Sequence, residues 1–229
     1  KYFISGSLRT DGSSRLSKDE RWGAFWSVSG AWNLAREEFM QASWLNDLRL
    51  KVSYGTNGTL PAGYYSYMPL YYFGGGYGAS SAIYWYALGN EGLTWEKSNT
   101  LNVGLETQLF SKLGFSIEYY KKQTKDLLMS LQTSYLSGFG SYTANNGEIS
   151  NNGVEIELRA INITAGDFSW NGDFNIAFQK AKVDKLPDGT DVYAGHDNQY
   201  IYREGEDMWS FYLPEWAGVD PETGVGLYY

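Results

Sequence analysis

The segment TLNVGLETQLFSKLGFSIEYY, residues 100–120, decides the fold. In its first half Leu101, Val103 and Leu105 fall on one side of an extended chain, and mostly polar residues fall on the other. The same alternation resumes at residue 113, after a connection of about three residues. A period of two indicates a β-strand, and so short a connection joins antiparallel neighbours. The segment therefore predicts a β-hairpin with one apolar face and one polar face.

Working outward, the same alternation recurs along most of the chain. The further predicted strands are residues 2–9, 26–34, 48–54, 154–159 and 168–179, with an eighth, less regular run around residues 209–219. A single helical turn is expected at residues 35–41, and no longer helical pattern competes. The sequence therefore predicts an all-β, antiparallel fold of about eight strands.

The connections between these strands alternate between short and long. The short ones are residues 35–44, 110–112 and 162–167; the long ones are residues 10–21, 56–92, 127–148 and 183–207. Outer-membrane β-barrels have short turns at the periplasmic end and long loops outside. Their strands also carry aromatic girdles at both lipid–water interfaces. We expect Trp44, Phe110, Phe168 and Trp170 at the short-turn end, and Trp22, Tyr54, Trp95 and Tyr119 at the long-loop end.

Composition excludes several other classes of protein. The 229 residues carry a net charge of −8 and no Cys, and 17% of them are aromatic. Nucleic-acid binding is not expected, because phosphates are neutralised by clustered Lys and Arg. The lack of Cys removes disulfides, thiolate metal sites and cysteine nucleophiles. No run approaches the ~18 apolar residues of a membrane-spanning helix, but alternating barrel strands escape that test.

No motif or group of candidate catalytic residues indicates an enzyme. The only His is His196, and there is no Gly-x-Ser-x-Gly motif. Asp184, Asp188, Asp191 and Asp197 are expected to serve turns rather than Ca²⁺, because the EF-hand register is not met. We expect no catalytic residue, no metal and no cofactor.

Two groups of residues are candidate contact sites. Tyrosines crowd the long connection at residues 56–92, where flat, amphipathic rings suit sugars, peptides or a partner protein; they could equally pack on one another. The second group lies on the polar faces of the strands and is expected to line the barrel lumen. The loop candidates are Tyr64, Tyr65, Tyr67, Tyr71, Tyr72 and Trp85, and the lumen candidates are Glu106, Glu118, Glu155, Glu157 and Arg159.

Several motifs, in this order, resemble one family, the SusC/RagA-type TonB-dependent outer-membrane transporters. The motifs are RTDGSSR at residues 9–15, LNDLRLKVSYG at 45–55, LTWEK at 93–97, YYKK at 119–122, TKDLL at 124–128, GEI at 147–149, NGVEI at 152–156, REG at 203–205 and AGVDPETG at 217–224. Two departures concern loop details: AFWS at residues 24–27, and LPEW at 213–216 before the AGV run.

The resemblance implies that the chain is the later part of a 22-stranded transmembrane barrel. A plug domain, an N-terminal domain, a TonB box and further strands are then expected outside residues 1–229, so the chain is expected to be truncated. The implied function is active import of an oligosaccharide or oligopeptide across the outer membrane of a Gram-negative bacterium. The implied partners are a SusD-like surface lipoprotein, the TonB complex and outer-membrane lipid.

Other classes of protein remain open at this point. The chain could be a complete small β-barrel serving as a membrane anchor or adhesin, since about eight strands can close. It could be a soluble glycan-binding β-sandwich, whose strands would also alternate. A passive porin is the further alternative, distinguished by the lack of a plug.

Overall fold

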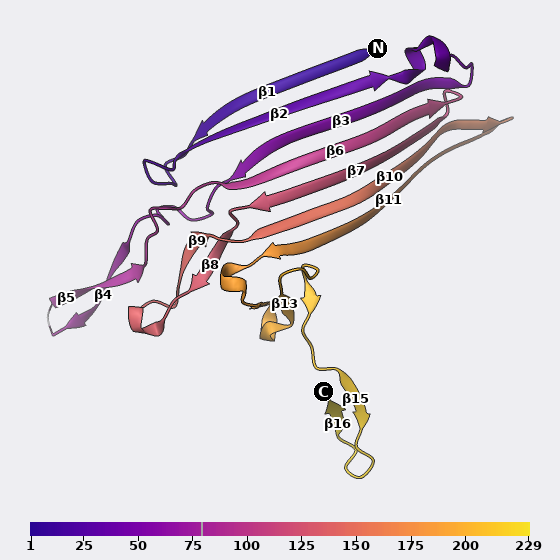
Figure 1. Ribbon diagram of the computed structural model, residues 1–229. Helices are drawn as coiled ribbons and strands as arrows, with labels where there is room; N and C mark the ends of the chain where they lie inside the picture. Colours follow the sequence, from indigo (N-terminus) through magenta and orange to yellow (C-terminus); the bar gives the residue numbers. More distant parts are fainter. Residues whose placement is uncertain (79) are drawn as a thin grey trace.

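The computed structural model describes residues 1–78 and 80–229. Its main body is one antiparallel sheet of seven strands in the order β1-β2-β3-β6-β7-β10-β11 (Figure 1). The strands are β1 (Tyr2–Gly12), β2 (Trp22–Asn33), β3 (Leu45–Thr59), β6 (Glu96–Leu109), β7 (Leu113–Lys125), β10 (Glu148–Ala165) and β11 (Phe168–Lys185). The structure thus confirms seven of the eight expected strands as a continuous wall.

In the described part of the chain, nine shorter strands belong to the connections. They form the hairpins β4–β5 (Leu70–Tyr77, Ser80–Ala87), β8–β9 (Leu128–Gln132, Ser141–Asn145) and β15–β16 (Trp216–Val219, Gly226–Tyr228), and the small sheet β12-β13-β14 (Val192–Ala194, Tyr200–Tyr202, Ser210–Phe211). The eighth expected run, residues 209–219, is therefore divided between two small sheets and does not join the wall. Pro214 lies between the two parts and has no backbone N–H for a ladder bond.

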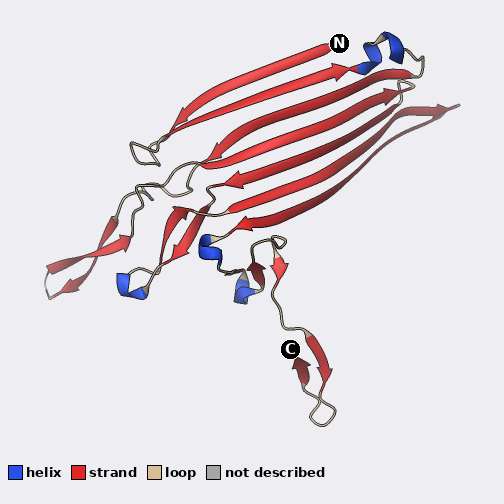
Figure 2. Cartoon of the chain, in the orientation of Figure 1, coloured by secondary structure: helices blue, strands red, loops and turns tan. Residues whose placement is uncertain are grey.

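The only helical segments among the described residues are short 3₁₀ turns (Figure 2). They are η1 (Leu34–Arg36), η2 (Glu38–Met40), η3 (Tyr135–Ser137), η4 (Pro187–Gly189) and η5 (His196–Asn198). The helical turn expected at residues 35–41 is thus two 3₁₀ turns. Within the described part of the chain, no helix has the length and apolar character needed to cross a membrane.

The short and long connections lie at opposite ends of the wall. The turns between β2 and β3, β6 and β7, and β10 and β11 share one end, and the small sheets lie at and beyond the other (Figure 1). Several wall strands also run further toward the long-loop end than the apolar alternation does. β3 continues to Thr59, β10 begins at Glu148 and β11 continues to Lys185. The wall therefore projects beyond its alternating region on that side.

The register separates two faces. Residues that are direct neighbours across the sheet share a face. One row reads Gly30, Val52, Val103, Tyr119, Val154, Phe178, and the next apolar row reads Trp32, Leu50, Leu105, Ile117, Ile156, Ile176. The intervening row reads Ala31, Lys51, Gly104, Glu118, Glu155, Ala177. Each row lies on a single face of the wall because a pleated sheet turns alternate residues to opposite sides.

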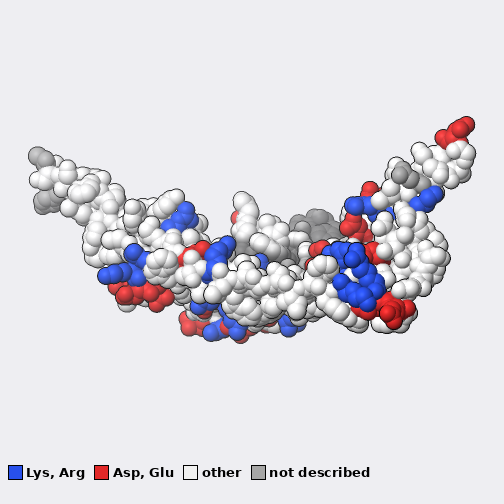
Figure 3. Space-filling model, turned by 90° about the horizontal axis from the view of Figure 1, so that it is seen from above, with Lys and Arg blue, Asp and Glu red and all other residues white. Residues whose placement is uncertain are grey.

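In the described residues, neither face of the wall carries a packed core away from its long-loop end. On the apolar face Ile4 is 86% exposed and Phe178 is 59% exposed. Seen from above, the molecule is an elongated, bowed body with wide uncharged surface between groups of charged side chains (Figure 3). Single-layer exposure of this extent fits an apolar face whose neighbour is lipid rather than a second sheet.

The main buried cluster lies at the long-loop end, where Phe25 of β2 meets residues of the connections. It consists of Leu16, Phe25, Leu93 and Trp95, which we call the loop-base cluster. The rings of Phe25 and Trp95 meet edge to face, 5.4 Å between centroids, and the Trp95 indole N–H donates to the carbonyl of Arg21 at 3.2 Å. A methyl group on Gly58 would overlap the Phe25 ring, so this position requires glycine.

Trp95 was expected in the outer aromatic girdle, and this expectation is wrong. Its side chain is only 5% exposed, because it packs among residues from two loops that are distant in sequence. The alternation pattern could not reveal this, since contacts between residues 16 and 93 depend on the register of the whole wall.

Candidate functional site

The aromatic candidates of residues 56–92 divide into two groups with different surroundings. Tyr71, Tyr72 and Trp85 lie on the hairpin β4–β5, which projects from the end of β3 and β6 (Figure 1). Tyr64, Tyr65 and Tyr67 lie in the turn-rich segment before that hairpin. Only the hairpin residues form a continuous aromatic surface.

Both faces of the β4–β5 hairpin carry ring pairs. On one face Tyr71 lies opposite Trp85 with 4.5 Å between centroids, and the edge of Phe139 approaches Trp85 at 6.0 Å. On the other face Tyr72 stacks on Tyr84 at 5.4 Å. Aromatic pairs at such distances stabilise a hairpin by about 0.5–1.5 kcal/mol each. The rings thus support one another while about half of each remains exposed.

Tyr64 is held by Arg15 from the β1–β2 connection. The guanidinium of Arg15 lies 4.4 Å from the centroid of the Tyr64 ring and also donates to the Tyr64 hydroxyl at 3.1 Å. Its second donor reaches the carbonyl of Pro61 at 3.1 Å. Tyr64 therefore links two long connections and is still 67% exposed, so its free ring edge remains accessible.

Tyr67 differs from the other candidates because it is partly buried against the loop-base cluster, together with Leu60 and Leu128. Its ring packs on the base of the loop, and its role as a contact residue stays a prediction. Tyr65 is 56% exposed and takes a left-handed backbone conformation, φ +62°, at the turn.

The β8–β9 hairpin is tied to the same base by amide side chains. Asn145 accepts from the backbone N–H of Thr94 at 2.8 Å and donates to the carbonyls of Thr94 and Asp126. Asn90 donates to the carbonyl of Thr143. The bases of three long connections thus form one hydrogen-bonded platform, from which the β4–β5 rings project.

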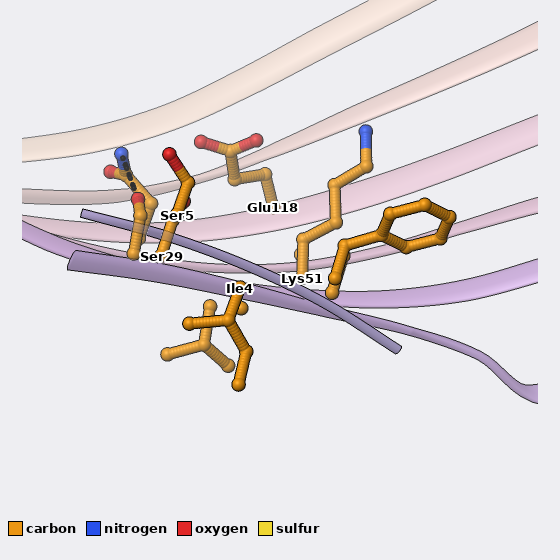
Figure 4. A pocket seen from close by; sticks show the side chains of 12 residues that line it. Ile4, Ser5, Ser29, Lys51 and Glu118 are labelled. Atoms are coloured by element: carbon orange, nitrogen blue, oxygen red, sulfur yellow. Dashed lines mark hydrogen bonds between the residues drawn. The ribbon is translucent and has the colours of Figure 1, made fainter. Parts of the chain in front are cut away.

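The charged candidates all lie on the polar face of the wall. Glu106 forms an ion pair with Lys51, and Arg159 bridges Glu157 at 3.0 Å and Asp173 at 2.7 Å. These groups line shallow depressions on that face, together with Ser116 and Asn175. Figure 4 shows the neighbouring part of this face, where Ser5, Ser29, Lys51 and Glu118 project to one side and Ile4 to the other.

Glu118 and Glu155 are direct cross-strand neighbours. Like charges in this position repel each other. Among the described residues, neither carboxylate has a Lys or Arg within ion-pair distance. The centre of the polar face is therefore locally negative.

The four aspartates that were expected to serve turns, Asp184, Asp188, Asp191 and Asp197, serve separate local structures. Asp188 and Asp197 adopt left-handed conformations in η4 and η5, Asp184 accepts from Ser150, and Asp191 pairs with Arg203 at 2.7 Å. This pairing lowers the pKa of Asp191 below its ordinary value, mainly through the hydrogen bond from the guanidinium. Within the described ranges, no three His, Asp or Glu side chains are grouped as metal ligands.

Sequence reasoning did not single out the aromatic residues of the small β12-β13-β14 sheet. Tyr200 stacks on Phe211 at 5.3 Å, and Trp209 meets Tyr200 and Tyr202 edge to face at 5.7 and 5.4 Å. Their crowding within twelve residues, 200–211, was the available signal. The sequence does not predict this group because the alternation of apolar and polar residues is interrupted there.

Comparison with known proteins gives a consistent result. The model of the family "TonB dependent receptor-like, beta-barrel" matches residues 1–229. The chain is 36% identical to TonB-dependent receptor P3 of Formosa agariphila, over 96% of this chain and 23% of that protein. It is 33% identical to TonB-dependent receptor SusC of Bacteroides thetaiotaomicron, over 83% of this chain and 20% of that protein.

Among solved structures, the chain is similar to one described as the RagAB peptide importer in the closed-closed state. The TM-score is 0.91 at 31% sequence identity, covering all of this chain and 25% of that chain. The open-open state of the same importer matches with a TM-score of 0.88. The chain thus spans about a quarter of the length of these relatives.

Proposed function

Because the chain belongs to the β-barrel family of TonB-dependent receptors, which are outer-membrane proteins of Gram-negative bacteria, we propose that it forms part of the wall of a nutrient importer energised through TonB. The observation that carries the proposal is the seven-stranded wall with one apolar and one polar face, which superimposes on an importer with a TM-score of 0.91.

The two faces and two ends give the wall its orientation. The apolar rows face lipid, and the polar rows, with Glu106, Glu118, Glu155, Glu157 and Arg159, face the lumen. The short turns lie on the periplasmic side. The long connections, including β4–β5, are extracellular. We place the plug and the TonB box in the length that the relatives have beyond this chain.

The imported nutrient is an oligosaccharide or an oligopeptide, and a SusD-like surface lipoprotein works with the importer. A relative described as a peptide importer supports the peptide class, and the relative named SusC supports the wider family. The exposed rings of Tyr71, Tyr72 and Trp85 offer flat contact area for either class of ligand or for the lipoprotein.

The wall does no covalent chemistry in this proposal. The charged side chains of the polar face pair with one another or stand on an open wall, and His196 is exposed beside Asp197 in a turn. Import proceeds by rearrangement of the plug, and the barrel supplies the path.

The other classes of protein fit the structure less well. In the described residues β1 and β11 are the two edges of the wall and do not pair with each other, so the seven strands do not close into a small barrel. A sandwich would need a second sheet packed on the apolar face, whereas Phe174 and Phe178 there are more than half exposed.

The test is energised uptake by the full-length protein. A strain lacking the gene, and the same strain complemented with it, are offered fluorescent oligosaccharides and oligopeptides in parallel, with and without a protonophore. We expect protonophore-sensitive uptake of one class only in the complemented strain. The double variant Y71A/W85A should reduce that uptake several-fold, while Phe39→Ala, an exposed aromatic at the short-turn end, should not. Equal uptake with and without the gene would overturn the proposal.

A further inference from the structure

The net charge of the chain is concentrated in its last part. Residues 186–229, which we call the acidic segment, contain nine Asp and Glu against a single Arg, whereas residues 1–185 contain seventeen acidic and seventeen basic residues. The whole excess of −8 therefore belongs to the 44 residues that follow β11. These residues lie beyond the long-loop end of the wall (Figure 1).

Most of this charge is not neutralised within the described structure. Asp191 is paired with Arg203, and Asp207 with Lys180 of β11. Glu204 and Asp220 accept backbone N–H groups, which leaves their charge in place. In the described part of the chain, Asp188, Glu206, Glu215 and Glu222 have no ion pair or side-chain hydrogen bond.

The same segment exposes large aromatic side chains. Tyr200, Tyr202, Trp209 and Phe211 form the group of ring contacts described above, which we call the aromatic corner. Trp209 is 56% and Phe211 71% exposed, and Trp209 is held at a left-handed φ of +68°. Further along, Trp216 packs edge-on against Tyr228 in the β15–β16 hairpin, and both remain more than half exposed.

Exposed Trp and Tyr that extend over a whole segment are typical of protein interfaces, where such rings supply most of the binding energy. Unpaired carboxylates in the same segment favour a partner surface of opposite sign. Trp and Tyr faces also attract Lys and Arg cations directly. Apolar contact and charge thus point to the same kind of partner.

We propose that the acidic segment is a docking surface for a basic patch on the surface lipoprotein, with Lys or Arg side chains of that protein seated against the aromatic corner. This inference rests on the proposed function, which includes the lipoprotein. It adds which segment of the transporter binds the lipoprotein, and the charge of the lipoprotein surface that is bound. The long extent of the exposed rings favours a protein surface over a single short ligand.

The experiment measures affinity between the purified full-length transporter in detergent and its purified lipoprotein at 50 and 500 mM NaCl. The test variant removes the four unpaired carboxylates: D188N, E206Q, E215Q and E222Q. The matched control removes four exposed carboxylates elsewhere: D19N, E38Q, E91Q and D167N. A further pair compares Trp209→Ala with Phe39→Ala.

We expect the test variant to bind about tenfold more weakly at 50 mM NaCl and to lose most of its salt dependence. The control should match the unmodified protein. Trp209→Ala should weaken binding at both salt concentrations, because its contribution is largely apolar. Acetylation of the lipoprotein's lysines, which removes their charge, should weaken binding more than reductive methylation, which keeps it.

The inference is wrong if the test and control variants bind equally well. It is also wrong if cross-linking through residues 206 and 215 joins only other segments of the transporter, since the surface would then be covered by its own chain. Either result is compatible with the proposed function, provided that protonophore-sensitive uptake persists. If the complemented strain shows no such uptake, the proposed importer function itself is refuted.

Discussion

Phe174 tests the assignment of the apolar face to lipid. Its ring is 56% exposed, and its neighbour across the sheet is Leu158. On the same face of β11, Trp170 marks the short-turn interface and Lys180 is the first charged residue toward the long-loop end. A barrel strand tilted by roughly 40° climbs about 2.5 Å per residue. The ten residues from Trp170 to Lys180 then span about 25 Å, the height of the apolar band of such barrels.

Phe174 lies about 10 Å above Trp170 on this scale, close to the middle of the band. We therefore expect Phe174→Arg to destabilise the folded barrel by about 2–4 kcal/mol. Phe168→Arg, at the interface, should cost only about 0–1 kcal/mol. Asn175→Arg, next to Phe174 but on the polar face, should cost no more than that, because the lumen solvates the cation.

The assay is urea titration of the full-length barrel in lipid vesicles, followed by the shift in electrophoretic mobility between folded and unfolded forms. Outer-membrane level in cells gives an independent readout. The assignment is refuted if Asn175→Arg is as damaging as Phe174→Arg, or if Phe168→Arg costs as much as the mid-band substitution. Either result would mean that the free-energy cost of an Arg substitution does not depend on the face of the wall or on the depth in the apolar band.

Three further outcomes follow from particular contacts. Leu93 is fully buried, so Leu93→Ala should destabilise the loop-base cluster by about 2–5 kcal/mol and speed proteolysis of the long connections on intact cells, without changing the wall. The pKa of Glu37 is lowered to about 2, mainly by the hydrogen bond from Trp32 and then by Lys1 and Tyr2. The stabilisation of the folded protein by ionised Glu37 should be complete above about pH 4.5 and lost as the pH falls toward 2. The difference in melting temperature between wild type and E37Q should therefore shrink over that interval. A methyl group on Gly153 would lie 2.5 Å from the carbonyl oxygen of Phe178, whereas at Gly104 the nearest atom is 3.5 Å away. G153A should therefore lower the urea midpoint and G104A should leave it nearly unchanged.

The wall and its two faces could be predicted because their physics is local. Each strand must alternate to meet lipid on one side and polar groups on the other, so segments such as residues 100–109 show their faces without any partner. The outer extensions of β3, β10 and β11 were missed because alternation fades beyond the apolar band. The hairpin β4–β5 was not predicted for a related reason. Its tyrosines lie on both faces, so no alternation of apolar and polar residues indicates its strands.

The candidate site was only partly predictable. Tyr71, Tyr72 and Trp85 are exposed as expected, but Tyr67 is used in packing, and no local pattern distinguishes it from Tyr65. The difference depends on where Leu16 and Leu93 lie, and these residues come together only through the wall. The like-charge neighbours Glu118 and Glu155 likewise depend on strand register.

The amino-acid sequence by itself determined the strand class, the lipid and polar faces, the alternation of short and long connections, and the concentration of acidic charge after residue 185. These follow from side-chain period and composition, which act within a few residues. The tertiary structure decided the cross-strand register, the burial of Trp95 and Tyr67, and the grouping of Tyr200, Tyr202, Trp209 and Phe211 into one surface. Such contacts join residues far apart in the chain, and their free energy is gained only once the whole wall has brought them together.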